Sequence, residues 1–85
     1  MRTNYLDNFR KGIIKATDIE LAIGLYSVSE IRGAVATGYR VKANKARRAT
    51  PTIASYLDSV ADVLDKGQPI NVFGVVLRKD RIDPR

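Results

Sequence analysis

The sequence contains no cysteine and no histidine among its 85 residues. Without cysteine the chain forms no disulfide framework and offers no thiolate ligand to a metal. Without histidine it lacks the commonest general base and the commonest metal-binding side chain. We therefore expect a protein that is not an enzyme, has no small-molecule substrate, and uses neither a metal nor another cofactor.

Long hydrophobic runs are also missing. No segment approaches the roughly 18 consecutive apolar residues that cross a bilayer. The N-terminal residues 1–16 alternate charged and apolar side chains, without the hydrophobic stretch of a secretory signal. We expect a cytoplasmic protein with no membrane partner, either associated with a nucleoid or free in the cytoplasm of a host.

The small size of the chain limits its stability. A domain of 85 residues buries only about 60–65% of the surface that its unfolded chain exposes, so self-association would stabilise it. We expect one small helical domain over residues 1–85, assembled as a homodimer or a higher homo-oligomer. Residues 78–85 are rich in charge and are expected to form a flexible tail.

Two capping boxes predict two separate helices. Thr17 with Glu20, and Ser27 with Glu30, match the pattern in which a hydroxyl accepts from the third helical N–H and a glutamate reaches back to the cap amide. Gly24 lies between them, at the position where a left-handed residue commonly ends a helix. The pattern predicts a helix, a tight turn and a second helix.

A third helix is predicted to begin at Thr50, where a threonine cap precedes Pro51 at the first helical position. It should end at residues 66–67, because the glycine there and the proline that follows do not continue a helix. One face carries Asp58, Asp62 and Asp65, which we interpret as solvated rather than as a metal site. The other face is apolar and consists of Ile53, Tyr56, Leu57, Val60, Val63 and Leu64.

The first segment is predicted to be a helix from Asn4 to about Lys15, with Thr3 as its cap. Gly12 weakens the pattern, because glycine in a helix interior is unfavourable relative to alanine. Its apolar side would carry Leu6, Phe9, Ile13 and Ile14.

Residues Ile70 to Leu77 are rich in β-branched side chains and predict one strand. Its hydrogen-bonding partner is either the stretch from Tyr39 to Ala43 or the same strand of a second subunit. We favour the second subunit, because the helix that begins after Ser27 is expected to continue through Tyr39. The predicted fold is mainly α, with three to four short helices and one C-terminal strand paired across a dimer.

The pair of helices from Thr17 to about Val41 resembles a helix-turn-helix in order and spacing, with Ala22 as the small residue and Gly24 opening the turn. The resemblance implies that the helix after Ser27 enters the major groove of DNA. Its solvent face would carry Ser29, Arg32, Ala36 and Arg40, while Val28, Ile31, Val35 and Gly38 turn inward.

On this interpretation Arg32 contacts guanine, Ser29 touches a base or a phosphate, and Ala36 permits close approach. The alternative is that small residues pack helices closely between subunits, with Arg32 an ordinary surface charge. The small residues concerned are Gly33, Ala34, Ala36 and Gly38.

Positive charge is concentrated in the stretch from Tyr39 to Arg48, which holds five cations and no carboxylate in a chain of net charge +6. Such a cluster attracts a phosphate backbone, because each neutralised phosphate releases condensed counterions. The acidic helix is expected to face away from it. Alternatively, the cluster is a solvated loop that keeps the protein soluble. The five cations are Arg40, Lys42, Lys45, Arg47 and Arg48.

The cationic stretch has no aromatic residue except Tyr39 at its edge, so a stacking platform for single strands or RNA is poorly supported, and duplex DNA is the favoured partner. The four tyrosines are interpreted as residues at the edge of the core. The leading hypothesis is a small, basic, dimeric DNA-binding protein, a transcriptional regulator or architectural factor of phage or plasmid type. Its predicted binding residues are Ser29, Arg32, Arg40, Lys42, Lys45, Arg47 and Arg48. The alternative is a self-assembling structural or adaptor protein, such as a virion component or an inhibitor of a host protein.

Overall fold

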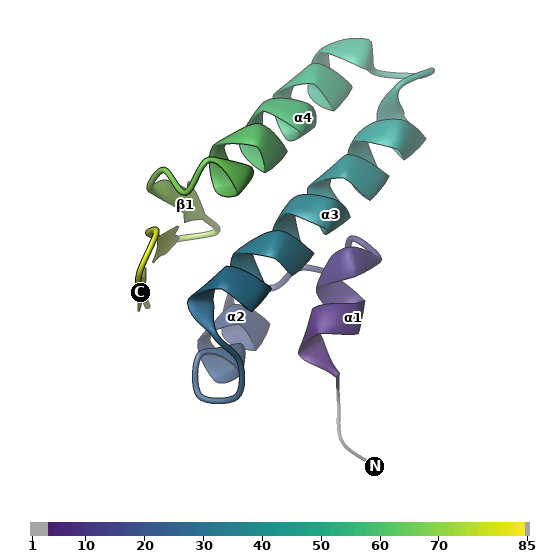
Figure 1. Cartoon of the computed structure of the whole chain (residues 1–85). Coiled ribbons are helices and arrows are strands. Elements are labelled where there is room, and N and C mark those ends of the chain that lie inside the picture. The colour runs from purple at the N-terminus through teal and green to yellow at the C-terminus, as the bar shows by residue number, and fades with distance from the viewer. Residues whose placement is uncertain (1–3, 85) are drawn as a thin grey trace.

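A computed structural model describes residues 4–84 of the chain. Within this range the fold is mainly helical, with a small antiparallel sheet near the C-terminus (Figure 1). The elements follow in the order α1 (Tyr5–Arg10), α2 (Ala16–Ala22), α3 (Val28–Ala46), α4 (Pro51–Asp65), β1 (Ile70–Val72), β2 (Val75–Leu77) and β3 (Ile82–Asp83).

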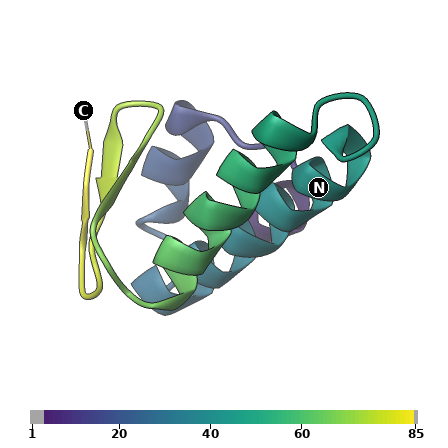
Figure 2. The same cartoon turned by 90° about the horizontal axis from the view of Figure 1, so that it is seen from above.

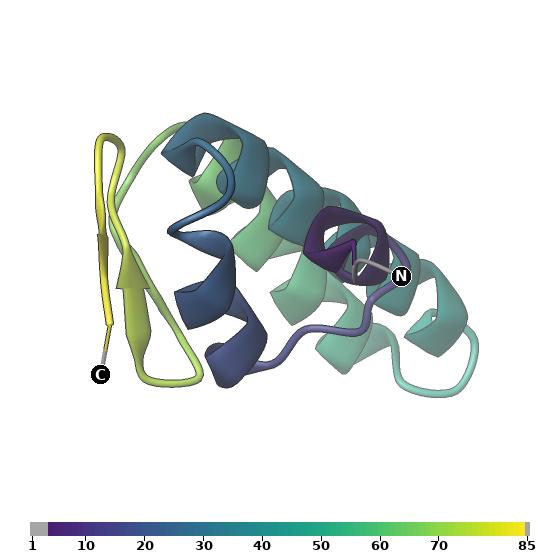
Figure 3. The ribbon, with the colours of Figure 1, turned by 90° about the horizontal axis from the view of Figure 1, so that it is seen from below.

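The long helix α3 is the centre of the molecule. It runs beside α4 in the opposite direction, and α1 packs across it (Figure 1). Seen from below, α1 and α2 lie in front of the α3–α4 pair (Figure 3). The sheet lies at one end of this arrangement and the turn between α3 and α4 at the other (Figure 2). No helix in the described range is long and apolar enough to cross a bilayer.

The capping box at Ser27 is present as predicted. The Glu30 amide donates to the Ser27 hydroxyl at 3.1 Å, and the Ser27 amide donates to the Glu30 carboxylate at 3.2 Å. The predicted box at Thr17 is wrong, because α2 already begins at Ala16, with Lys15 as a cap that makes no side-chain bond. Thr17 therefore lies inside the helix rather than at its start.

Helix α1 is shorter than expected. It is capped by the side chain of Asn4, which accepts from the Asp7 amide at 3.2 Å, whereas the predicted cap Thr3 lies outside the described residues. The chain leaves the helix at Gly12, whose φ of 92° is left-handed. Ile13 consequently lies beyond the helix and is exposed, although we expected it on the apolar side.

The predicted start and end of α4 are confirmed. The helix is preceded by Thr50, and it ends before Gly67, whose φ is 74°. The Thr50 hydroxyl does not cap α4, since it donates instead to the Ala46 carbonyl at 3.2 Å. On the apolar face Val60 and Leu64 are buried, whereas Ile53 and Tyr56 are exposed.

The predicted single strand is wrong, because its two halves pair with each other. β1 and β2 form an antiparallel hairpin in which Ile70 lies opposite Leu77. The turn is made by Phe73 and Gly74, with φ values of 52° and 90°, and the Gly74 amide donates to the Asn71 side chain at 2.8 Å. The partner of the expected strand is therefore its own second half rather than the stretch from residue 39 to 43.

The expected tail contains a third strand. β3 pairs with the other edge of β2, so that Ile82 lies opposite Leu77 and is buried. The Arg78 side chain donates to the Asp83 carboxylate at 2.7 Å, which ties the end of β2 to β3. Residues 82–83 are therefore part of the sheet, and β2 is its central strand.

Candidate nucleic-acid interface

Arg32 is buried, with 4% of its surface exposed, so its predicted place on the solvent face of α3 is wrong. All three guanidinium nitrogens donate to backbone oxygens at 2.6–3.2 Å. Burial lowers the pKa of Arg32, and the charge of Asp65 opposes this shift. The acceptors are the carbonyl oxygens of Val63, Leu64, Gln68, Leu77 and Arg78.

These contacts give Arg32 a structural role. They join α3 to the last turn of α4, where the Gly67 amide also donates to the Leu64 carbonyl, and to the end of β2. The guanidinium is therefore unavailable for a guanine contact. Ala36, also predicted to face DNA, is fully buried, and of the four predicted solvent-face residues only Ser29 is exposed and Arg40 half-buried.

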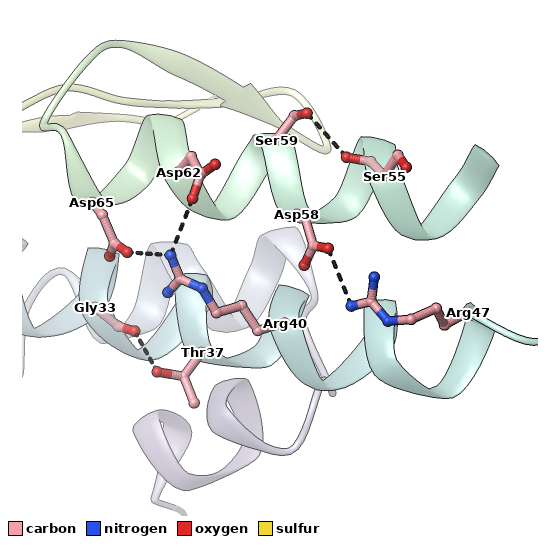
Figure 4. Close-up of polar contacts among 9 residues, drawn as sticks. All are labelled: Gly33, Thr37, Arg40, Arg47, Ser55, Asp58, Ser59, Asp62 and Asp65. Atoms are coloured by element: carbon pink, nitrogen blue, oxygen red, sulfur yellow. Dashed lines mark hydrogen bonds and ion pairs between the residues drawn. The ribbon is translucent and has the colours of Figure 1, made fainter. Parts of the chain in front are cut away.

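Two of the five predicted cations are held by the acidic face of α4 (Figure 4). Arg40 contacts Asp62 at 3.4 Å and makes a closer ion pair with Asp65. The hydrogen bond to Asp65 raises the pKa of Arg40 above its ordinary value. Arg47 contacts Asp58 at 3.2 Å. The expectation that the acidic helix faces away from the basic stretch is therefore wrong, because the two lie side by side.

The other three cations of the stretch, Lys42, Lys45 and Arg48, make no ion pair with any carboxylate in the range 4–84. Lys45 and Arg48 are exposed, and Lys42 is half-buried. The Lys42 ammonium lies 6.0 Å from the centre of the Tyr39 ring, within range of a cation–π contact.

A fourth cation is the chain neighbour of a residue that contacts Lys42. The stem of Lys42 runs along Gly12, since a Cβ built on Gly12 would stand 3.1 Å from the Lys42 Cγ atom. The preceding residue, Lys11, is exposed and also makes no ion pair within the described range. No sequence pattern predicts this neighbour, because 30 residues separate Lys11 from Lys42. We call Lys11, Lys42, Lys45 and Arg48 together the lysine surface.

The α3–α4 pair has two chemically different sides. Successive residues of a helix are about 100° apart, so Lys42 points away from Arg40 on α3, and Tyr56 points away from Asp58 on α4. One side holds the ion pairs (Figure 4), and the other holds Lys42 and Tyr56. Burial raises the pKa of Tyr39, and the Tyr56 phenol raises it further.

Ser29 lies at the opposite end of α3 from the lysine surface. It lines a cavity of about 360 Å³ with Arg32, Gly33 and Lys79, so the structure does not bring it together with the other predicted binding residues. Within residues 4–84 no cluster of carboxylates is suited to hold a metal ion.

No protein-family model matches the chain, and neither a curated protein nor a solved structure is significantly similar to it.

Proposed function

We propose that the protein binds nucleic acid through phosphate contacts made by the lysine surface. The observations that carry the proposal are two: Gly12, the neighbour of Lys11 in the chain, packs against the stem of Lys42, and Lys11, Lys42, Lys45 and Arg48 all lack a carboxylate partner in the described range. Neutralising phosphates with such cations releases counterions and is favourable whatever the base sequence.

Base reading by the N-terminal part of α3 is not part of the proposal, since Arg32 is engaged by carbonyl oxygens of its own chain. Three of the four cations of the lysine surface are lysines, which act as point charges rather than as the bidentate forks that recognise guanine. These features favour a sequence-neutral, architectural role over a regulator that reads an operator. The helices α2 and α3, which resemble a helix-turn-helix in sequence, would then serve to position α3 and would make no base contacts.

The test is binding of a fluorescein-labelled oligonucleotide at low salt, measured by anisotropy. The double variant K42A/K45A should bind roughly ten-fold more weakly, since two phosphate contacts are lost. The control K66A/K79A removes the same charge from the sheet end of the molecule and should bind like the wild type. Equal weakening by both pairs would mean that only net charge matters, and would contradict a defined surface.

A second candidate function is assembly through protein contacts, which would also include a dimer. It is favoured by three large apolar side chains exposed at the end of α2 and in the turn before α3. Exposed apolar groups of this kind mark interaction sites in many proteins. Sedimentation velocity of the wild type and of L25S tests it, with loss of an oligomer in the variant as the expected result. The three residues are Leu21, Ile23 and Leu25.

A further inference from the structure

We propose that Tyr56 is a stacking position for an unpaired base, so that the lysine surface takes single-stranded or locally unpaired nucleic acid. This inference rests on the proposed function and specifies its substrate. It departs from the sequence-based preference for duplex DNA, which depended on the lack of aromatic residues within the basic stretch itself.

Tyr56 is the most exposed aromatic residue in the described range, ahead of Phe73 in the hairpin turn at 53%. Its exposed fraction is 66%, whereas Tyr39 is buried at 7% and the remaining two tyrosines, Tyr5 and Tyr26, are half-buried. Ile53, one helical turn earlier, is 51% exposed. Both lie on a face of α4 that continues into the buried residues Val60 and Leu64, so the apolar face extends beyond the part that the core covers.

The ring lies on the same side of the α3–α4 pair as Lys42. Tyr56 points away from Asp58 on α4, as Lys42 points away from Arg40 on α3, and the Lys42 ammonium lies 6.0 Å from the centre of the Tyr39 ring. The carboxylate of Asp58 points to the other side, toward Arg47. A nucleotide at this position would therefore meet an aromatic ring and Lys42 on the side away from the ion pairs.

This combination fits an unpaired strand better than a duplex. In a duplex each base is already stacked on its neighbours and offers only its edges to a protein. In a single strand the base faces are accessible, and a groove of cations with an aromatic side chain binds backbone and base together. Ile53 would supply an apolar contact for the same base or for the next one.

The experiment compares a non-self-complementary single strand with the same strand annealed to its complement, using anisotropy at constant salt. The wild type should bind the single strand more tightly. Y56A should lose about 5- to 100-fold in affinity for the single strand, the range expected when one base loses its stacking partner. Its affinity for the duplex should change less than about two-fold, and Y56F, which keeps the ring, should bind the single strand like the wild type.

Tyrosine fluorescence gives a second readout. The chain has four tyrosines and no tryptophan, so quenching of tyrosine emission on binding reports stacking directly. Most of the quenching should disappear in Y56F, because phenylalanine stacks but does not emit in the same range. This readout decides the question even if Y56A folds poorly.

The outcomes distinguish a failure of stacking on Tyr56 from a failure of nucleic-acid binding by the lysine surface. If the wild type binds duplex as tightly as the single strand, or if quenching is the same in Y56F and the wild type, the stacking role is wrong while nucleic-acid binding stands. If the wild type binds neither oligonucleotide and a protein partner or a second copy covers Tyr56 instead, the proposed function itself fails.

Discussion

Gly38 of α3 lies directly against the backbone of Phe9 in α1, so that a Cβ built on Gly38 would stand 1.8 Å from the Phe9 carbonyl oxygen. No side chain fits at that distance, and the obstacle is backbone rather than a mobile side chain. The glycine therefore allows α1 to cross α3. Close packing by small residues, one of the interpretations of this helix, occurs here within one chain.

Replacing Gly38 by alanine should destabilise the protein by about 3 kcal/mol, the upper part of the range for overpacking, because α1 must move as a unit. The matched control is Gly33 in the same helix, where a built Cβ meets no atom within 4 Å. G33A should stabilise by about 0.5–1 kcal/mol through helix propensity. Urea unfolding followed by circular dichroism measures both, and equal effects at the two sites would contradict the packing argument.

Replacing Arg32 by methionine should lower stability by about 3 kcal/mol, because the buried carbonyl oxygens of Leu64 and Leu77 would lose the charged donor that the guanidinium provides. R32K should recover only part of this, since an ammonium cannot reproduce the planar fork that reaches both α4 and β2. Hydrogen exchange should show faster exchange of the β2 amides in R32M. Unchanged protection of β2 would indicate that the sheet does not depend on Arg32 for its attachment.

The ion pair between Arg78 and Asp83 should make stability depend on pH. The hydrogen bond from Arg78, with the charge of Arg81, holds the pKa of Asp83 below its ordinary 3.8. A lowered pKa in the folded state means that the stabilisation is complete above that ordinary value and is lost as the pH falls through the folded pKa. The difference in urea midpoint between wild type and D83N should be present at neutral pH. It should shrink only when the pH falls below the ordinary pKa of 3.8. A difference that is constant with pH would contradict the ion pair.

Replacing Asp58 by asparagine should strengthen nucleic-acid binding, because Arg47, which adjoins Arg48 of the lysine surface in the chain, would lose its carboxylate partner and become available to phosphate. Since the pair is partly exposed and weak, we expect a gain of about two- to five-fold. D80N makes the same change of charge in the exposed turn before β3, remote from the lysine surface, and is the control. Anisotropy at low salt measures both, and an equal gain in D80N would point to net charge alone.

Short sequence patterns are sufficient to predict the ends of the two long helices. The Ser27 capping box marks the start of α3, the Thr50–Pro51 pair marks the start of α4, and Gly67 marks the end of α4. These signals can be read from the sequence because each involves residues only a few positions apart. The Thr17 box failed since α2, only seven residues long, is positioned by burial of Ile19 and Ala22 rather than by its cap.

The other errors concern contacts between residues far apart in the sequence. The carbonyl partners of Arg32 lie more than 30 residues away, so a cation on a helix looks solvent-facing until α4 and β2 are placed. The hairpin was missed because Phe73 is an unusual residue for a left-handed turn, although Gly74 within a strand pattern was a signal. Tyr56 matches the apolar period of α4, and only the arrangement in space leaves it uncovered.

The salt dependence of binding measures how many cations of the lysine surface contact phosphate. If all four do, a double-logarithmic plot of affinity against salt concentration should have a slope of about −2.8 for a single strand and about −3.6 for a duplex. In a variant with Lys11, Lys42, Lys45 and Arg48 replaced by alanine, the slope should fall close to zero. A variant that kept the wild-type slope, or a wild type whose binding ignored salt, would contradict the account.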